Sequence, residues 1–298
     1  EYRIADIQSK AAFQRRSSRK PARTDLSPEQ IVAQDAVVNL TDRMDASGKV
    51  TWDVPAGRWT IVRFGHTSTG VENAPAPKTG RGLECDKLGT EGIEANFTRM
   101  MAKLVADTGI RPGQHEGGLA ATHIDSWENG SQNWTAKMRE EFQRRRGYDL
   151  LPFLPVMTGR VVGCLEVSER FLWDLRQTIS ELVIENYAGR MHELANAAGM
   201  RFTVEAYGGP CDAIPYGGQS DEPMGEFWTP SGGAIETCRG MASAGHVYGK
   251  RIIGAEAFTS GDHERWLEHP AILKSHGDRA FCEGINRFVF HRYAMQPW

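Results

Sequence analysis

The stretch His123-Ile124-Asp125-Ser126-Trp127-Glu128-Asn129-Gly130 decides how this chain can fold, because it closes the short apolar run Gly118-Leu119-Ala120-Ala121-Thr122. Such a run is typical of a buried strand, and here it ends abruptly in two carboxylates. Burying a charge without a partner is costly. We therefore expect Asp125 and Glu128 to lie at the open C-terminal mouth of a parallel sheet, where the active sites of (β/α) folds lie.

Three further segments place a glutamate at the end of a short apolar run. They are residues 202–207 with Glu205, residues 224–228 with Glu226 and residues 252–258 with Glu256. Four such segments on one chain predict a ring of carboxylates around one pocket. That arrangement is typical of enzymes that hydrolyse glycosidic bonds.

Composition restricts the class of protein. The chain has 298 residues, of which 40% are hydrophobic and 24% charged, as in an ordinary globular protein. A net charge of -3 gives no basic surface for nucleic acid. We expect no membrane span, because no apolar stretch is long enough. The polar opening at Glu1 carries no signal peptide, and we expect the chain to be an internal piece of a longer protein.

Alternating strand and helix patterns predict an α/β fold, a (β/α) TIM-like barrel preceded by a remnant of a β-domain. We assign residues 1–57 to a loop and a partial β-domain, and residues 58–298 to the barrel. Expected strands in the first part are 36–40 and 50–54, and 59–66 is expected to be the first barrel strand. Expected helices are 91–107, 135–146, 168–198, 234–244 and 270–282, and the last strand is 285–293. Fewer than eight strands are clear, so closure of the barrel is inferred.

Glycoside hydrolysis needs one carboxylic acid to protonate the leaving oxygen and a second carboxylate to attack the sugar or activate water. The acid needs a raised pKa, which burial or a nearby like charge can provide. Glu128 follows Trp127, Glu256 lies between two alanines and Glu226 precedes two aromatic residues. A salt-bridged or solvent-facing strand end would explain any one of these glutamates equally well. Their recurrence favours catalysis, but the pattern does not say which pair reacts.

The remaining candidates are side chains that could contact a sugar or a metal ion. Trp127 and Trp228 could stack on sugar faces, although many tryptophans serve packing instead. His291 could contact a sugar hydroxyl, and a structural histidine is the alternative. The expected substrate-binding residues are Asp125, Trp127, Glu205, Trp228 and His291. Asp221 and Glu222, together with Glu205 and Glu226, form an oxygen-rich set suited to calcium, although no EF-hand spacing is present.

With these residues in view, the sequence resembles the glycoside hydrolase family 106 α-L-rhamnosidases. The matching blocks are Val54-Pro55-Ala56-Gly57-Arg58-Trp59-Thr60, Gly82-Leu83-Glu84-Cys85-Asp86-Lys87-Leu88, Asp125-Ser126-Trp127-Glu128, Arg145-Arg146-Gly147-Tyr148-Asp149, Glu169-Arg170-Phe171-Leu172-Trp173-Asp174, Glu226-Phe227-Trp228 and Ala255-Glu256-Ala257-Phe258-Thr259. They cover nearly the whole chain from about residue 35 onward. So many blocks in the same order make the resemblance specific.

The resemblance implies a (β/α) barrel that removes terminal α-L-rhamnose from plant-type polysaccharides or glycosides, with inversion and with a calcium ion in the pocket. It implies that Glu128 is the general acid and that Glu256 is the base that activates water. Glu226 would be a third essential carboxylate that holds the metal or a rhamnose hydroxyl, and Glu226 and Glu205 are the expected metal ligands. A periplasmic or extracellular location is expected from the same resemblance.

Two other functions fit the same residues. One is a non-catalytic carbohydrate-binding barrel or an inactive fragment, which would bind rhamnosides without turnover. The other is a retaining glycosidase of different specificity. The carboxyl groups of an inverting pair lie about 6.5–9.5 Å apart, and those of a retaining pair about 5–5.5 Å apart.

Overall fold

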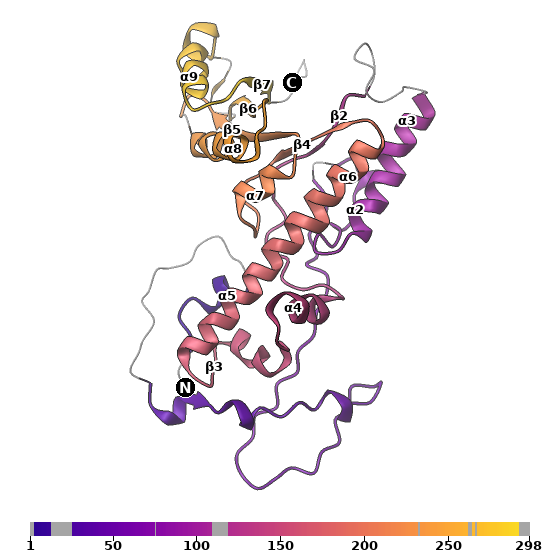
Figure 1. The fold of residues 1–298 in the computed structure, drawn as a ribbon, viewed down its shortest axis with the longest axis vertical. Coiled ribbons are helices and arrows are strands. Elements are labelled where there is room, and N and C mark those ends of the chain that lie inside the picture. Colours follow the sequence, from indigo (N-terminus) through magenta and orange to yellow (C-terminus); the bar gives the residue numbers. More distant parts are fainter. Residues whose placement is uncertain are drawn as a thin grey trace. The chain divides into compact units, whose positions relative to one another are not determined.

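The computed structural model describes residues 3–12, 26–74, 76–108, 119–231, 233–261, 264–265 and 267–291 (Figure 1). The chain forms two compact units. Unit 1 comprises Glu1–Glu84 and Ser131–Ile179, and unit 2 comprises Cys85–Gly130 and Ser180–Trp298. This grouping does not test the expected β-domain remnant at residues 1–57, which stays a prediction.

Unit 1 is a small, mostly helical body with an aromatic core. Its regular elements are α1 (Ile7–Ala12), β1 (Ile31–Val32), α4 (Met138–Arg146), the 3-10 helix η6 (Leu151–Thr158), β3 (Val161–Val162) and the first turns of α5 (Leu165–Leu182). Short 3-10 turns are η1 (Pro28–Gln30), η2 (Gln34–Ala36), η3 (Thr41–Arg43) and η4 (Lys78–Gly80). Phe171 of α5 packs against Phe142 at 5.8 Å and against Phe153 at 5.6 Å between ring centroids. These buried rings hold the helices of the unit together.

The strands expected at 36–40, 50–54 and 59–66 are wrong. Residues 44–72 hold no extended ladder; Met44 and Val50 form a single bridge there. Trp59 packs edge-on against Trp52 at 5.0 Å, and its indole nitrogen donates to the Pro55 carbonyl. Alternating apolar residues form a stable strand only where further strands supply backbone partners. Of the region expected to be loop, residues 7–12 are helical, and residues 13–25 lie outside the described chain.

Unit 2 is built on a five-stranded parallel sheet, which confirms the α/β class. The strands are β2 (Ala121–Ile124), β4 (Arg201–Glu205), β5 (Glu222–Trp228), β6 (Gly254–Thr259) and β7 (Arg287–Phe290), in the order β2-β4-β5-β6-β7. The acidic strand ends at residues 125, 205, 226 and 256 were therefore assigned to the right elements. In the described part of the chain the sheet is open, with β2 and β7 at its edges (Figure 1).

Helices connect the strands and confirm the predicted helical pattern. In unit 2 and across its boundary they are α2 (Glu91–Asn96), the π-helical η5 (Phe97–Met101), α3 (Ala102–Thr108), α5 with the π-helical η7 (Val183–Gly189) and α6 (Arg190–Ala197), α7 (Ala213–Gly218), α8 (Ile235–Tyr248) and α9 (Pro270–Cys282). The long helix begins three residues before Ser168, whose buried hydroxyl bonds to Val162 instead of capping the helix. Gly199 ends it at a φ of +75°. None of the described helices has the length and apolarity to cross a lipid bilayer.

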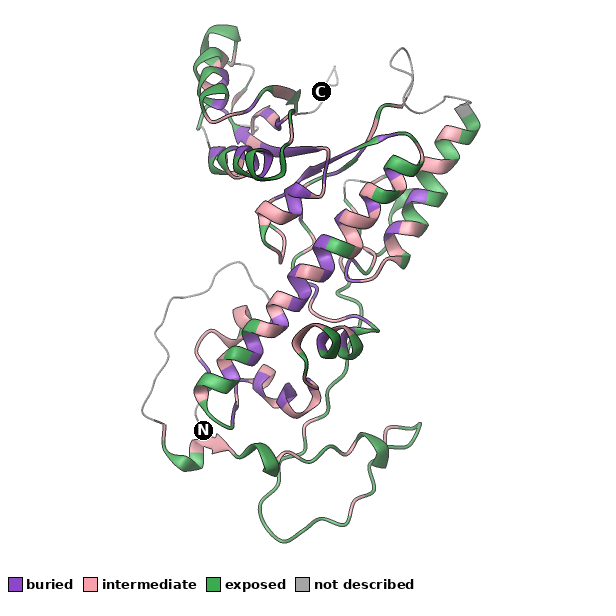
Figure 2. Cartoon of the chain, in the orientation of Figure 1, coloured by how far each residue is buried: buried purple, intermediate pink, exposed green. Residues whose placement is uncertain are grey.

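The central strands are buried on both faces (Figure 2). Phe202 and Val204 of β4 are fully buried, as parallel sheets covered by helices require. On β5, Gly225 allows α8 to approach closely. A Cβ atom at Gly225 would lie 2.7 Å from the backbone nitrogen of Cys238 and 2.8 Å from its Cα atom. The absence of a side chain at Gly225 therefore sets the spacing between α8 and the strand that carries Glu226.

Replacing Gly225 by Ala is expected to destabilise unit 2. The added methyl group meets backbone atoms that cannot move aside, and overpacking of this kind costs roughly 1–3 kcal/mol. Gly240→Ala in α8 is the matched control, because nothing lies within 4 Å of the position its Cβ would take. The midpoint of thermal unfolding should fall for the first variant and stay or rise for the second. Equal midpoints would contradict the close packing of α8 on β5.

Candidate functional site

The register of the parallel strands places the acidic side chains on one face of the sheet. Paired residues in neighbouring strands point to the same face, as do residues two apart along one strand. The paired positions are His123–Thr203, Glu205–Met224 and Glu226–Glu256. Asp125 follows His123 by two residues and lies beyond the end of β2. The carboxylates from four strands therefore share one face, near the carboxyl ends of their strands.

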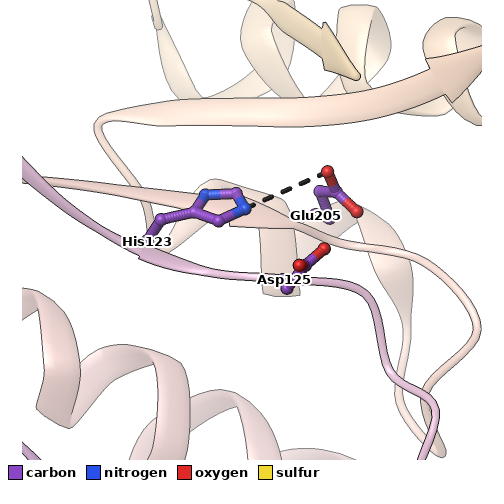
Figure 3. Close-up of side chains that lie close together, drawn as sticks. All are labelled: His123, Asp125 and Glu205. Carbon is purple, nitrogen blue, oxygen red and sulfur yellow. Dashed lines mark ion pairs between the residues drawn. The ribbon is translucent and has the colours of Figure 1, made fainter. Parts of the chain in front are cut away.

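His123, Asp125 and Glu205 form the tightest group in the site. Their potential ligand atoms all lie within 4.8 Å of one another (Figure 3). The Nε2 atom of His123 lies 3.9 Å from Oε1 of Glu205, and its Nδ1 shares a 2.7 Å hydrogen bond with the Thr203 hydroxyl. Loss of water around the His123 ring lowers its pKa, and the charges of Asp125 and Glu256 only partly oppose that shift. His123 therefore favours the neutral form, which can bind a metal ion or accept a proton.

Glu205 is the most perturbed carboxyl group in the site. Its side chain is 2% exposed, and burial raises its pKa to about 9. The negative charges of Asp125 and Glu256 and a hydrogen bond with Asp125 add to the rise, while a hydrogen bond from Tyr207 opposes it. At neutral pH the buried carboxyl group therefore retains its proton unless a positive charge comes close.

Glu226 and Glu256 face each other across β5 and β6. Burial raises the pKa of Glu226, and the charges of Glu256 and Glu128 add to this rise, against hydrogen bonds from Trp228 and Tyr207. The Trp228 indole nitrogen donates to Oε2 of Glu226 at 3.2 Å. Two hydrogen bonds between the Thr237 hydroxyl and the Glu226 backbone, of 2.8 and 3.1 Å, anchor this residue to α8.

Glu256 has polar partners that hold it as an acceptor. The Thr259 hydroxyl donates to its Oε1 atom at 2.7 Å. The Nε2 atom of His291 lies 4.0 Å from the same oxygen, and the His291 backbone nitrogen donates to the Ala257 carbonyl. His291, which was predicted to contact substrate, therefore lies next to Glu256, the residue predicted to be the base.

Glu128 lies on the exposed segment that follows β2. It accepts a 3.2 Å hydrogen bond from the Ser126 hydroxyl. Its charge helps to raise the pKa of Glu226, and Glu226 is the cross-strand neighbour of Glu256. Register and proximity group Asp125, Glu205, Glu226 and Glu256 in one acidic cluster. For Glu128 the link to this cluster is only the effect of its charge on the pKa of Glu226, so its place in the site stays a prediction.

Trp127 has a different role from the one predicted. It is 4% exposed, whereas Trp228 is 37% exposed. Its ring packs edge-on against Tyr187 at 6.4 Å, and its indole nitrogen donates to the Gly130 carbonyl at 2.7 Å. The Lys87 ammonium lies 5.7 Å from the centre of the Trp127 ring. This burial argues against a sugar platform at Trp127 and indicates that Trp127 fixes the segment that carries Glu128.

The oxygen-rich set that included Asp221 and Glu222 is not assembled. Glu222 begins β5, at the opposite end of that strand from Glu226, and it forms ion pairs with Arg201 and Arg287. Asp221 accepts from the Phe202 backbone nitrogen. Of the predicted metal ligands, Glu205 belongs to the group around His123. Glu226 shares a face of the sheet with Glu205, because Glu205 pairs with Met224, two residues before Glu226.

Tyr207, Thr203 and Thr259 are site residues that were not predicted from the sequence. Each lies two or three residues from a predicted carboxylate or histidine on the same strand or strand end. Thr203 could have been found from Glu205 by counting, because side chains two apart along a strand share a face. Tyr207 could not, because a tight turn beyond β4 brings it to Glu205. Thr259 could not, because a register irregularity between Glu226 and Trp228 shifts its place.

Comparisons with known proteins give the relatives of this chain. A family model described as alpha-L-rhamnosidase matches residues 1–298. A protein of Formosa agariphila named "Putative beta-glucuronidase" is 41% identical over 276 residues, 91% of this chain and 23% of that protein. The solved structure of a rhamnosidase from Novosphingobium sp. PP1Y matches with a TM-score of 0.80 and 29% identity, over 98% of this chain and 29% of that one. The chain thus spans less than a third of either relative.

Proposed function

The chain belongs to the α-L-rhamnosidases of glycoside hydrolase family 106, and from this membership we propose that its acidic cluster removes terminal α-L-rhamnose from plant-type polysaccharides or rhamnosides. The observation that carries the proposal is the convergence of carboxylates from four strand ends, with Glu226 and Glu256 as cross-strand neighbours. Family membership makes the protein a glycoside hydrolase that acts on carbohydrate. The sugar, the stereochemistry and the metal are the parts proposed here.

In the proposed reaction Glu128 protonates the leaving oxygen and Glu256 activates water. The exposed position of Glu128 suits contact with the aglycone side of a bound glycoside. Glu256 accepts hydrogen bonding from Thr259 and faces His291, and such a carboxylate can take a proton from water. Glu226 would hold a sugar hydroxyl between these two groups, and the half-exposed Trp228 would contact a sugar face. We propose inversion, which proton NMR of the first-formed anomer would test against a retaining outcome.

The name of the Formosa agariphila relative suggests a different sugar, a glucuronide. A glucuronic acid residue carries a carboxylate, and a site for it needs a cation. Within the described ranges, no lysine or arginine forms an ion pair with Asp125, Glu128, Glu205, Glu226 or Glu256, whose carboxylates already repel one another. In the described part of the chain, therefore, only a bound cation could balance a sugar carboxylate at this cluster. The family model, described as alpha-L-rhamnosidase, is what favours the neutral deoxy sugar in this proposal.

The test is hydrolysis of two chromogenic substrates by the protein that carries this chain. An α-L-rhamnoside should be cleaved, and a β-D-glucuronide should not. Cleavage of the glucuronide alone would overturn the choice of sugar. Saturable binding of rhamnosides without any turnover would instead favour the non-catalytic carbohydrate-binding barrel.

We propose that a cation, calcium by resemblance, binds at this cluster with Glu205 and Glu226 among its ligands. The residues fit a positive charge, because burial, with the charges of Asp125 and Glu256, raises the pKa of Glu205 to about 9. Asp125 would supply another oxygen, and the nitrogen of His123 is a ligand that calcium seldom takes. The ion would orient sugar hydroxyls.

Removal of metal is expected to lower rhamnosidase activity, because the crowded carboxylates lose the charge that balances them. Activity should be measured after treatment with a chelator and again after addition of calcium or zinc. Recovery with calcium supports the proposed ion, and recovery with zinc alone would assign the site to His123 and a softer metal. Unchanged activity after chelation would contradict metal assistance.

We also propose that the open sheet is part of a (β/α) barrel, closed by further strands that pair with β2 and β7. The edge strand β7 exposes Val289 at 45% and Phe290 at 70%, which such strands would cover. A periplasmic or extracellular location, where plant-type glycans are met, would suit the proposed substrate.

A further inference from the structure

The hydroxyl group of Tyr207 lies among the carboxylates of the proposed active site. A tight turn beyond β4 brings it there, with the Tyr207 backbone nitrogen donating to the Glu205 carbonyl at 3.0 Å. The Ala206 backbone nitrogen donates to the Met224 carbonyl of β5 and ties this turn to the neighbouring strand. The Tyr207 side chain is therefore held by the sheet and not by a free loop.

The Tyr207 hydroxyl holds the carboxyl group of Glu205. It donates to Oε2 of Glu205 at 2.5 Å, which is a short hydrogen bond. The negative charges of Glu226 on β5 and Glu256 on β6 also act on the hydroxyl, so it lies within the acidic cluster. One phenol thus fixes a candidate metal ligand inside the proposed active site.

The chemistry of the phenol limits what it can do. Burial, together with the carboxylate of Glu205, raises the pKa of Tyr207, so the hydroxyl stays neutral and keeps its proton. A neutral phenol offers one hydrogen to donate and oxygen lone pairs to accept. It can orient carboxyl groups, but it is neither a charged base nor an ionised nucleophile.

From this geometry we propose that Tyr207 is a positioning residue that fixes the carboxyl group of Glu205 within the acidic cluster. The proposal deepens the proposed function and rests on it, because the orientation of Glu205 matters for hydrolysis at this cluster. Without the hydroxyl, Glu205 loses this donor to Oε2, and its carboxyl group can turn toward Asp125.

The variant Tyr207→Phe removes the hydroxyl and keeps the ring, so the packing of the turn is retained. Unit 1 offers a matched control in Tyr148, whose hydroxyl donates to Asp174 at 2.9 Å. Tyr148→Phe deletes the same kind of tyrosine–carboxylate bond at a position outside the cluster. It therefore reports any general cost of losing such a bond.

With a chromogenic α-L-rhamnoside, Tyr207→Phe is expected to lower kcat by roughly 10- to 100-fold, in line with loss of a hydrogen bond to a charged group. KM and the thermal unfolding midpoint should change little, and Tyr148→Phe should match the wild type in kcat. A Tyr207→Phe enzyme with wild-type kcat would overturn the positioning role. So would a fall in kcat matched by Tyr148→Phe, because that would indicate a general loss of stability.

A second readout needs no substrate and separates this inference from the proposed function. Crystal structures of the wild type and of Tyr207→Phe should differ in the orientation of the Glu205 carboxyl group. An unmoved Glu205 carboxyl group would overturn the positioning role, whatever the enzyme hydrolyses. If the wild type cleaves no rhamnoside but this carboxyl group moves, the proposed function fails and the structural role of Tyr207 stands.

Discussion

Replacing Glu256 by Gln is expected to lower kcat for rhamnoside hydrolysis by about 10³- to 10⁴-fold, near the upper range for loss of a general base. An amide keeps the shape of the side chain, and it can still accept from Thr259, so the fold should be preserved. It cannot take a proton from water. Steady-state kinetics with a chromogenic α-L-rhamnoside, together with thermal unfolding, would measure both effects.

The loss in Glu256→Gln should be the same for substrates with good and poor leaving groups, because activation of water does not depend on the aglycone. Glu166→Gln is a suitable control, since Glu166 is an exposed helical residue paired with Arg170 in unit 1. The control should retain wild-type kcat. Full activity of Glu256→Gln would remove this residue from the mechanism.

Replacing Glu128 by Gln should show a different kinetic pattern. A general acid matters most when the departing oxygen is basic, so hydrolysis of an alkyl rhamnoside should fall by about 10³-fold or more. Hydrolysis of an activated aryl rhamnoside should fall much less, because its leaving group needs little protonation. The ratio of the two rates, measured for the wild type and for the variant, isolates the role of the acid.

The comparison of the two variants assigns roles within the acidic cluster. If Glu128→Gln slows both substrates equally and Glu256→Gln slows the alkyl rhamnoside selectively, the roles of acid and base are exchanged. If Glu128→Gln cleaves both at the wild-type rate, Glu128 has no catalytic role. The charge of Glu128 would then raise the pKa of Glu226 without any part in the reaction.

Much of the site could be predicted because each acidic residue follows a short apolar run that forms part of a parallel strand. Glu205 ends β4, Asp125 follows β2, and Glu226 and Glu256 lie within β5 and β6. Neighbouring strands of one parallel sheet bring such residues together once their runs are read as strands. The helices could be predicted equally well; α9, for example, covers the residues 270–282 that were expected to be helical. The local sequence pattern and the parallel topology of the sheet therefore explain most of the structure of unit 2.

The errors arose where tertiary contacts override local pattern. Residues 59–66 were expected to be the first barrel strand, yet no neighbouring strand pairs with them in the described chain. Trp127 looked like a sugar platform, but it is buried beside Tyr187 and Lys87. Asp221 and Glu222 lie near Glu226 in sequence, yet the length of β5 carries them to the other end of the strand. Each of these three features depends on contacts with residues that are distant in the sequence, so the local pattern does not predict it.

The central claim is that acidic side chains from separate strands face one another across the width of a sugar ring. A crystal structure of the protein with bound L-rhamnose tests it most directly, through the distance between the carboxyl groups of Glu128 and Glu256. An inverting enzyme requires about 6.5–9.5 Å, with the sugar between the two groups. Carboxyl groups about 5–5.5 Å apart would indicate a retaining enzyme, and side chains that point to opposite faces of the sheet would contradict the proposed reaction.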